Sequence, residues 1–228
     1  MTIKLKRDRI CAIILDMDGV LIDSEPIQLH AFRLYFENHD IPYTEKLLKS
    51  FIGFSVEENL RQIQKSLPTG KNFSIRESIV ERNRLYLELL NNEELKTMPG
   101  IDEIINCCIQ NEILLGLATS SPAEQVEVVL SRIRGAFSTK YKRLFQAIVN
   151  GEEVSHKKPA PDIYNLICKK LNTDESQAVS FEDSPAGVQS ARHAGLITVG
   201  ITNTYYNRQD LAAADFIVDS PSEILLML

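Results

Sequence analysis

Five short apolar runs, set apart by longer stretches, constrain the fold of this chain more than any other feature. Each run is bounded by polar or turn-forming residues, which is typical of strands that are covered on both faces in a parallel sheet. The runs occupy residues 11–15, 114–118, 147–149, 178–181 and 197–201. Helical patterns separate the later runs. This alternation predicts an α/β fold with a doubly wound, Rossmann-like parallel sheet.

Residues typical of helix ends support the alternation. The segment 121–124, Ser-Pro-Ala-Glu, has the spacing of a capping box with Pro at the first helical position. Residues 162–171 are apolar at helical spacing, and Ser184 begins a further helix that Gly195 would end. A last helix is expected to begin within residues 220–223. We interpret Ser121 and Ser184 as helix caps and not as nucleophiles, because no His-Asp arrangement accompanies them.

One stretch departs from the alternation. Helical patterns follow one another after the first strand, at residues 26–38 and behind capping boxes at residues 55–58 and 74–77, with no convincing strand. We interpret this insert as a lid domain, and helices that only cover one face of the sheet are the alternative. The expected parts are a catalytic core of residues 1–24 and 97–228 and a helical cap of residues 25–96.

The charge balance limits the partners of the chain. Lys and Arg number 25 against 31 Asp and Glu, which gives a formal net charge of −6. An acidic surface disfavours general affinity for nucleic acid or an anionic membrane. The early apolar run at residues 10–15 is too short for a signal segment or a membrane span. We therefore expect a cytoplasmic protein with no nucleic-acid or membrane partner, and the composition fits a monomer.

The four cysteines are predicted to be reduced. Cys11, Cys107, Cys108 and Cys168 lie in apolar or helical stretches, show no CxxC spacing, and include an adjacent pair. We interpret them as buried thiols of a cytoplasmic protein, in preference to a disulfide or metal set.

Polar residues follow three of the predicted strands. Residues 16–19 follow the first strand, residues 119–121 the second and residues 182–184 the fourth. Ligands of open α/β sheets bind outside the carboxyl ends of the strands. These loops are therefore expected to converge on one site, although they lie far apart in the sequence.

Three carboxylates would crowd this site. Asp16, Glu182 and Asp183 carry like charges, which are costly at short range unless a cation or a proton intervenes. Carboxylate oxygens with several waters suit Mg²⁺. A bound Mg²⁺ would attract a phosphate, which the acidic chain as a whole would not. The sequence therefore predicts Mg²⁺ as cofactor and a small phosphorylated metabolite as ligand.

Other residues of these loops suit phosphate chemistry. Thr119 and Ser120 offer hydroxyls close to the N–H groups that open a helix, and Lys158 can neutralise a phosphoryl group as a point charge. Asp16 beside Mg²⁺ and Lys would have a depressed pKa and be a competent nucleophile. Asp18, two positions on, could protonate the leaving oxygen. Each pattern is weak alone, and their combined order is specific.

These residues resemble the motifs of the haloacid dehalogenase-like hydrolases. Residues 16–25 are similar to the first motif, Thr119 to the second, Lys158 in Lys-Pro-Ala-Pro-Asp to the third, and residues 181–187 to the fourth. The resemblance extends over residues 10–219. The insert resembles the helical cap of the subfamily that contains β-phosphoglucomutase, phosphoglycolate phosphatase and the sugar-phosphate phosphatases.

The resemblance implies a role for each of these residues. Asp16 would be the nucleophile that becomes an aspartyl-phosphate, and Asp18 the general acid/base. The ligands of Mg²⁺ would be the Asp16 carboxylate, the Asp18 backbone carbonyl and Asp183, with Glu182 bound directly or through water. The residues expected to bind the phosphoryl group are Thr119, Ser120 and Lys158.

The resemblance also limits the reaction. Dehalogenases lack the second aspartate and phosphonatases usually carry a small residue there, so Asp18 favours a phosphatase or a phosphomutase. β-Phosphoglucomutases usually show a basic residue before a cap-loop glycine and an Arg three positions after it. Ile52 and Val56 stand at those places here. Hydrolysis of a small phosphate monoester, such as a sugar phosphate, is therefore expected, with phosphomutase as the alternative.

Several features of the sequence allow more than one interpretation. A binding protein that keeps the fold without catalysis is a third hypothesis. Arg82 either points from the cap toward the site or belongs to a solvated helix face. The basic stretch 133–144 is interpreted as a surface loop or a partner contact. Lys157 precedes Lys158, and the position of the following proline favours Lys158 as the lysine of the site.

Overall fold

The structure is a computed structural model that describes residues 10–52, 54–67, 73–137 and 140–225. Six parallel strands form one sheet in the order β3-β2-β1-β4-β5-β6. The strands are β1 (Ala12–Leu15), β2 (Leu114–Ala118), β3 (Ala147–Val149), β4 (Ala178–Glu182), β5 (Ile197–Ile201) and β6 (Phe216–Val218). β2 and β3 lie on one side of β1, and β4, β5 and β6 lie on the other side. This reversal of strand order after β3 confirms the predicted doubly wound sheet.

The sheet has one strand more than the sequence predicted. β6 is three residues long, lies at the sheet edge beside β5, and is only partly buried at two positions. The inner strands β1 and β4 are buried at every position. A search for buried apolar runs therefore finds the inner strands and misses this short edge.

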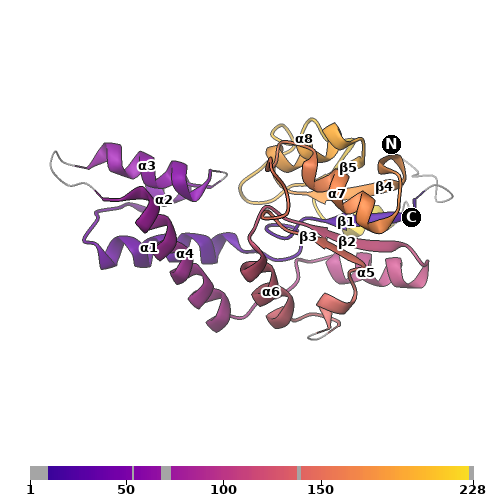
Figure 1. Cartoon of the computed structure of the whole chain (residues 1–228), viewed down its shortest axis with the longest axis horizontal. Coiled ribbons are helices and arrows are strands. Elements are labelled where there is room, and N and C mark those ends of the chain that lie inside the picture. The colour runs from indigo at the N-terminus through magenta and orange to yellow at the C-terminus, as the bar shows by residue number, and fades with distance from the viewer. Residues whose placement is uncertain (1–9, 53, 68–72, 138–139, 226–228) are drawn as a thin grey trace. The chain divides into compact units, whose positions relative to one another are not determined.

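Helices cover both faces of the sheet. α5 (Ile101–Gln110) and α6 (Ala123–Arg132) lie on one face, and α7 (Asp162–Leu171) and α8 (Pro185–Ala194) lie on the other (Figure 1). The short C-terminal helix α9 (Ser222–Leu225) packs against α5. Two 3-10 turns, η2 (Tyr141–Arg143) and η3 (Glu175–Gln177), precede β3 and β4. The strand ends stay accessible to loops because the helices lie on the faces.

The predicted helix caps give two different outcomes. Ser184 caps α8 by accepting a hydrogen bond of 3.1 Å from the Gly187 N–H, and Gly195 ends that helix with φ at +92°. Both features confirm the prediction. The predicted capping box at Ser121 is wrong, because α6 begins one residue later than expected, behind Pro122. The Ser121 hydroxyl donates a hydrogen bond to Asp18 Oδ2.

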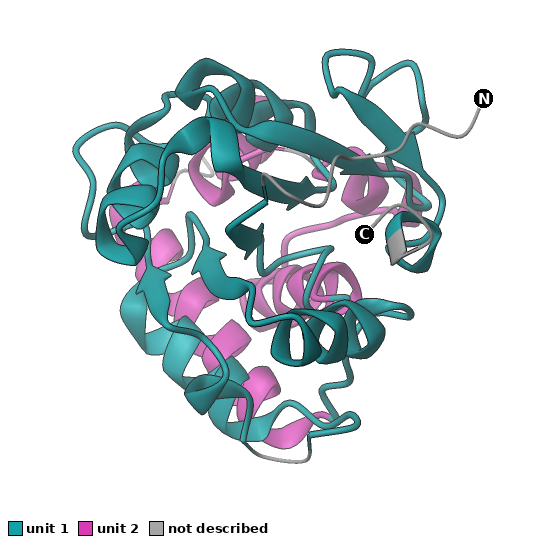
Figure 2. Ribbon diagram, turned by 90° about the vertical axis from the view of Figure 1, so that its right-hand side faces the viewer, with its two compact units in different colours: residues 1–23, 94–228 teal, residues 24–93 magenta. Residues whose placement is uncertain are grey.

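The chain divides into two compact units, Met1–Asp23 with Glu94–Leu228 and Ser24–Glu93 (Figure 2). The second unit holds α1 (Glu25–Asn38), α2 (Glu45–Lys49), α3 (Val56–Ser66) and α4 (Ile75–Asn92), and its described residues contain no strand. A full capping box opens α3, as its sequence predicts. No helix in the described part of the chain is long and apolar enough to cross a membrane.

The cysteines differ from the prediction in their burial. All four are free thiols. Cys108 and Cys168 are buried, and burial raises the pKa of each thiol to about 12. Cys107 is only partly covered and Cys11 is exposed, so the prediction of burial is wrong for these two. Cys11 precedes β1 instead of lying in it, which explains why the sheet does not cover its side chain.

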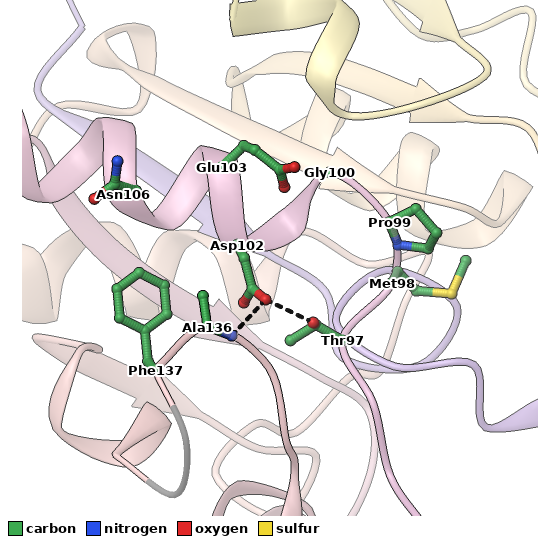
Figure 3. A pocket seen from close by; sticks show the side chains of 9 residues that line it. All are labelled: Thr97, Met98, Pro99, Gly100, Asp102, Glu103, Asn106, Ala136 and Phe137. Carbon is green, nitrogen blue, oxygen red and sulfur yellow. Dashed lines mark hydrogen bonds between the residues drawn. The ribbon is translucent and has the colours of Figure 1, made fainter.

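The basic stretch 133–144 is bound to α5 by two hydrogen bonds to one side chain. Asp102 on α5 accepts a hydrogen bond of 2.8 Å from the Ala136 N–H, which Figure 3 shows. Asp102 also accepts a hydrogen bond of 2.5 Å from the Tyr141 hydroxyl. Tyr141 is buried. A pocket of about 640 Å³ lies beside these contacts, between the start of α5 and Phe137. Residues 138–139 lie outside the described residues, and the partner contact stays a prediction.

Candidate active site

The turn after β1 packs against the loop after β4 and is hydrogen-bonded to the loop after β2. Asp16 directly follows β1, and Gly19 adopts φ at +77° in the turn behind it. A Cβ atom at Gly19 would lie 1.9 Å from Oδ2 of Asp183. Only glycine therefore permits both the backbone conformation and this approach. In the same turn, Asp18 Oδ2 accepts a hydrogen bond of 2.7 Å from the Ser121 hydroxyl.

Three carboxylates meet at the carboxyl ends of β1 and β4. Asp16, Glu182 and Asp183 are all buried, and each offers an oxygen within 4.8 Å of those of the other two. β1 and β4 are neighbours in the sheet, with Leu15 paired to Phe181, so the residues that follow each strand emerge side by side. The sequence-based expectation that these loops converge is met by their geometry.

Lys158 lies within this acidic group. Its Nζ donates hydrogen bonds of 2.6 Å to Asp16 Oδ1 and to Glu182 Oε1, and one of 3.2 Å to the Ala118 carbonyl. The Lys158 side chain is only 8% exposed. Lys157 is exposed, so the structure brings the predicted lysine of the pair into the cluster. One ammonium group thus bridges two of the three carboxylates.

Two side chains that the sequence analysis did not indicate also contact the carboxylate cluster. The Tyr164 hydroxyl donates to Glu182 Oε1, and its ring centroid lies 5.4 Å from Lys158 Nζ. The Asn203 amide donates a hydrogen bond of 2.9 Å to Asp183 Oδ2. Tyr164 has the apolar spacing of α7 and so resembled a core residue. A buried tyrosine needs a partner for its hydroxyl, which is the signal that would have indicated it.

The protein groups alone do not balance the charge of the cluster. Burial raises the pKa of Asp16 to about 7, an effect that Lys158 opposes only in part, and burial also raises the pKa of Asp183 well above its usual range. The expected depressed pKa of Asp16 is therefore not produced by the protein alone. Glu182 Oε2 is buried without a hydrogen-bond partner among the described residues. Each observation fits a group that would accept a cation.

The loop after β2 is arranged differently from the expectation. The Thr119 N–H donates to the Val149 carbonyl at 3.1 Å, so it continues the sheet and does not open a helix. Thr119 Oγ1 accepts from the Ser121 N–H at 3.0 Å. Ser120 is partly exposed, and its carbonyl lies so close to Gly151 that a Cβ there would meet it at 2.1 Å. The side chains of Thr119 and Ser120, and not a helix N-terminus, are thus the groups available here.

The helical unit holds a buried cation. Arg82 is 1% exposed, donates to the Gln28 carbonyl at 2.8 Å, and lies 4.5 Å from the centroid of the Phe32 ring. Burial lowers the pKa of Arg82 to about 10. The interpretation of Arg82 as part of a solvated helix face is therefore wrong. Ile52 and Val56 are partly exposed.

Fold and site together define an enzyme of the Rossmann-like α/β class, whose polar residues gather at the carboxyl ends of parallel strands. The profile of the family described as haloacid dehalogenase-like hydrolase matches residues 13–201. The chain belongs to this family, and the sequence-based prediction of a phosphatase enzyme of the family is confirmed.

Similarity to other proteins extends over nearly the whole chain. A phosphorylated carbohydrates phosphatase of Thermotoga maritima is 35% identical, over 95% of this chain and 97% of that protein. A β-phosphoglucomutase of Bacillus subtilis is 30% identical, over 95% and 92%. The crystal structure of CbbY from Rhodobacter sphaeroides in complex with phosphate superposes with a TM-score of 0.80 at 26% identity, over 94% and 96%.

Proposed function

We propose that this protein hydrolyses a small phosphate monoester, with a phosphorylated sugar as the substrate class, through an aspartyl-phosphate on Asp16. The observation that carries the proposal is the bridge from Lys158 to Asp16 and Glu182 inside a buried carboxylate cluster. The similarity to a phosphatase of phosphorylated carbohydrates supports the substrate class. The helical unit Ser24–Glu93 is proposed as the cap of the enzyme, and the other unit as its catalytic core.

The cofactor in this proposal is Mg²⁺. Asp16, the Asp18 carbonyl and Asp183 would hold it, with Glu182 as a direct or water-mediated ligand. The buried Glu182 Oε2 without a partner, and the raised pKa values of Asp16 and Asp183, support a cation at this place. When bound, Mg²⁺ would lower the charge on the phosphoryl oxygens and keep the carboxylates ionised.

Two aspartates divide the reaction. In the first step, an oxygen of Asp16 forms a bond to phosphorus while the ester oxygen leaves and takes a proton from Asp18. In the second step, Asp18 takes a proton from water, whose oxygen bonds to phosphorus and releases Asp16 and inorganic phosphate. Ser121 holds the Asp18 carboxylate through both steps. Lys158, Thr119 and Ser120 would bind the phosphoryl oxygens.

The test is a screen of the purified protein with Mg²⁺ against many phosphorylated metabolites, measured as released inorganic phosphate. The proposal expects release from at least one class of sugar phosphate and its loss when Mg²⁺ is chelated. Absence of release across the whole panel would favour a binding protein that retains the fold.

Phosphomutase is the second candidate, because the chain is similar to a β-phosphoglucomutase over nearly its whole length. The two reactions share the aspartyl-phosphate and differ in what accepts the phosphoryl group. Ile52 and Val56 offer no cation for the second phosphate of a sugar bisphosphate. With β-glucose 1-phosphate and a bisphosphate primer, free phosphate indicates hydrolysis and glucose 6-phosphate indicates a mutase.

A further inference from the structure

Asn203 contacts the carboxylate cluster from the loop that follows β5. Its Nδ2 donates a hydrogen bond of 2.9 Å to Asp183 Oδ2. Asn203 stands two positions after the last residue of β5, so this contact places it at the same edge of the sheet as the other polar loops. Neither composition nor motif spacing indicated this residue.

The orientation of the Asn203 side chain is fixed by its own loop. Its Oδ1 accepts hydrogen bonds of 2.7 Å from the Tyr205 N–H and 2.8 Å from the Tyr206 N–H. The Asn203 N–H donates back to the Tyr206 carbonyl, which closes the turn. Because the amide oxygen is committed to two backbone donors, the amide nitrogen is the atom that faces Asp183.

Asp183 Oδ2 has close neighbours in two loops. In the turn after β1, Gly19 approaches it so closely that a Cβ atom at Gly19 would lie 1.9 Å from this oxygen. In the loop after β5, Asn203 donates its hydrogen bond to the same oxygen. Asp183 is buried, so a rotation of its carboxylate would break this bond without water to replace it.

The donors around the cluster differ in charge. Lys158 donates to Asp16 and Glu182 and neutralises part of their charge, whereas Asp183 receives a neutral amide. A neutral donor orients a carboxylate and leaves its full charge for a cation. Partners of this kind around metal ligands fix the ligand orientation, and their loss typically weakens metal binding about 10- to 100-fold.

We propose that Asn203 is a positioning residue that fixes Asp183 for cation binding. This inference rests on the proposed function, because it assigns Asp183 to the metal. In the proposed role, Asn203 acts through Asp183 alone and contacts neither the phosphoryl group nor Asp16.

The test uses Asn203→Ser in the full chain. A serine hydroxyl can accept the backbone N–H groups of the same turn but is too short to reach Asp183. Asn207→Ser is the matched control, since Asn207 is exposed in the same loop and its Oδ1 accepts the Gln209 N–H at 2.7 Å. Asn203→Thr fills more of the side-chain volume and is the second variant if the serine variant fails to fold.

Binding of Mn²⁺, a paramagnetic substitute for Mg²⁺, is measured without substrate by the loss of its free spin-resonance signal. The dissociation constant is expected to rise at least ~10-fold in Asn203→Ser and Asn203→Thr, and to change less than about twofold in Asn207→Ser, which leaves Asp183 untouched. The Mg²⁺ concentration for half-maximal activity should rise in parallel, while kcat at saturating Mg²⁺ stays close to wild type.

The possible failures are distinguishable. Wild-type affinity in a folded Asn203→Ser variant would overturn the positioning role and leave the proposed function intact. Loss of the fold in both Asn203 variants, with Asn207→Ser folded, would show a structural role and overturn the inference as well. A wild-type chain that binds no Mn²⁺ and releases no phosphate would overturn the proposed function together with the inference.

Discussion

The Ser121 hydroxyl donates a hydrogen bond of 2.7 Å to Asp18 Oδ2 and so joins the loop after β2 to the loop after β1. The two residues lie 103 positions apart in the sequence. Ser121 is partly buried, and its N–H is bound to Thr119 Oγ1, which fixes the backbone from which the hydroxyl extends. The bond orients the carboxylate that we propose as the general acid and base.

Replacement of Ser121 by alanine tests this relationship. A hydrogen bond to a charged group contributes about 1.5–3 kcal/mol, so kcat is expected to fall ~10- to 100-fold if the orientation of Asp18 matters in the transition state. KM should change little. Ser131→Ala is the control on the adjacent helix α6, where the exposed hydroxyl donates to the Val128 carbonyl. Equal kcat values for Ser121→Ala and wild type would contradict the proposed role of the bond.

Tyr164→Phe removes one of the two donors to Glu182 Oε1. Loss of a partner from a buried charged group costs about 1–3 kcal/mol, and the free energy of unfolding is expected to fall by this amount. Tyr141→Phe is a matched control, because that buried tyrosine also donates to a carboxylate, Asp102. Both variants should lose stability, but only Tyr164→Phe should weaken Mg²⁺ activation, as measured by initial rates against Mg²⁺ concentration. An identical Mg²⁺ dependence in the two variants would show that Tyr164 only stabilises the fold.

The raised pKa of Asp16 predicts a pH dependence for the metal-free protein. The folded-state pKa is about 7 against an ordinary value of 3.8, so the folded chain keeps a proton that the unfolded chain has lost. The contribution of Asp16 to stability is therefore present below about pH 4 and is lost as the pH rises toward 7. The metal requires the ionised form, so Mg²⁺ affinity should rise over the same range, with proton release detectable by calorimetry in two buffers. Metal affinity that falls with increasing pH would contradict this assignment.

Arg82→Met tests the buried cation of the helical unit. The substitution removes the donor to the Gln28 carbonyl and the cation–π contact with Phe32, and is expected to lower the free energy of unfolding by about 1–3 kcal/mol, measured by urea denaturation. Arg84→Met is the control, since that side chain is exposed and pairs with Glu88 four residues on. Its effect should stay below about 0.5 kcal/mol. Equal effects of the two substitutions would contradict the structural importance of the Arg82 contacts.

Sequence reasoning was strongest where a residue type and a strand end coincide. Asp16 and Asp183 directly follow buried strands and Glu182 is the last residue of one, and parallel strands bring such positions to one edge. Lys158 lies in a loop and was found by its motif, because nothing in local periodicity indicates how far a lysine reaches. The inner strands were predicted for a similar reason, since strands that are buried on both faces are continuously apolar.

The residues that the sequence did not indicate depend on tertiary contacts. Tyr164 has the pattern of a core residue, and only its hydroxyl distinguishes its role. Asn203 lies in a loop whose position is set by the pairing of β5 with β6, the short edge strand that was itself missed. Ser121 fits a helix-cap pattern, but the helix begins behind Pro122, and the bond from the Ser121 hydroxyl to Asp18 depends on a contact between distant loops.

The most direct test of an aspartyl-phosphate on Asp16 is Asp16→Asn, measured with the metabolite that the wild type hydrolyses fastest. Loss of a nucleophile should lower kcat by at least ~10³-fold. The variant should remain folded and at least as stable without metal, because burial already favours the neutral form of this side chain. The predicted result is a phosphoryl group on Asp16 of the wild type, detected by mass spectrometry in reactions stopped during turnover. The same group should be absent from Asp16→Asn. A folded Asp16→Asn variant that retains wild-type turnover would contradict the role of Asp16 as the nucleophile.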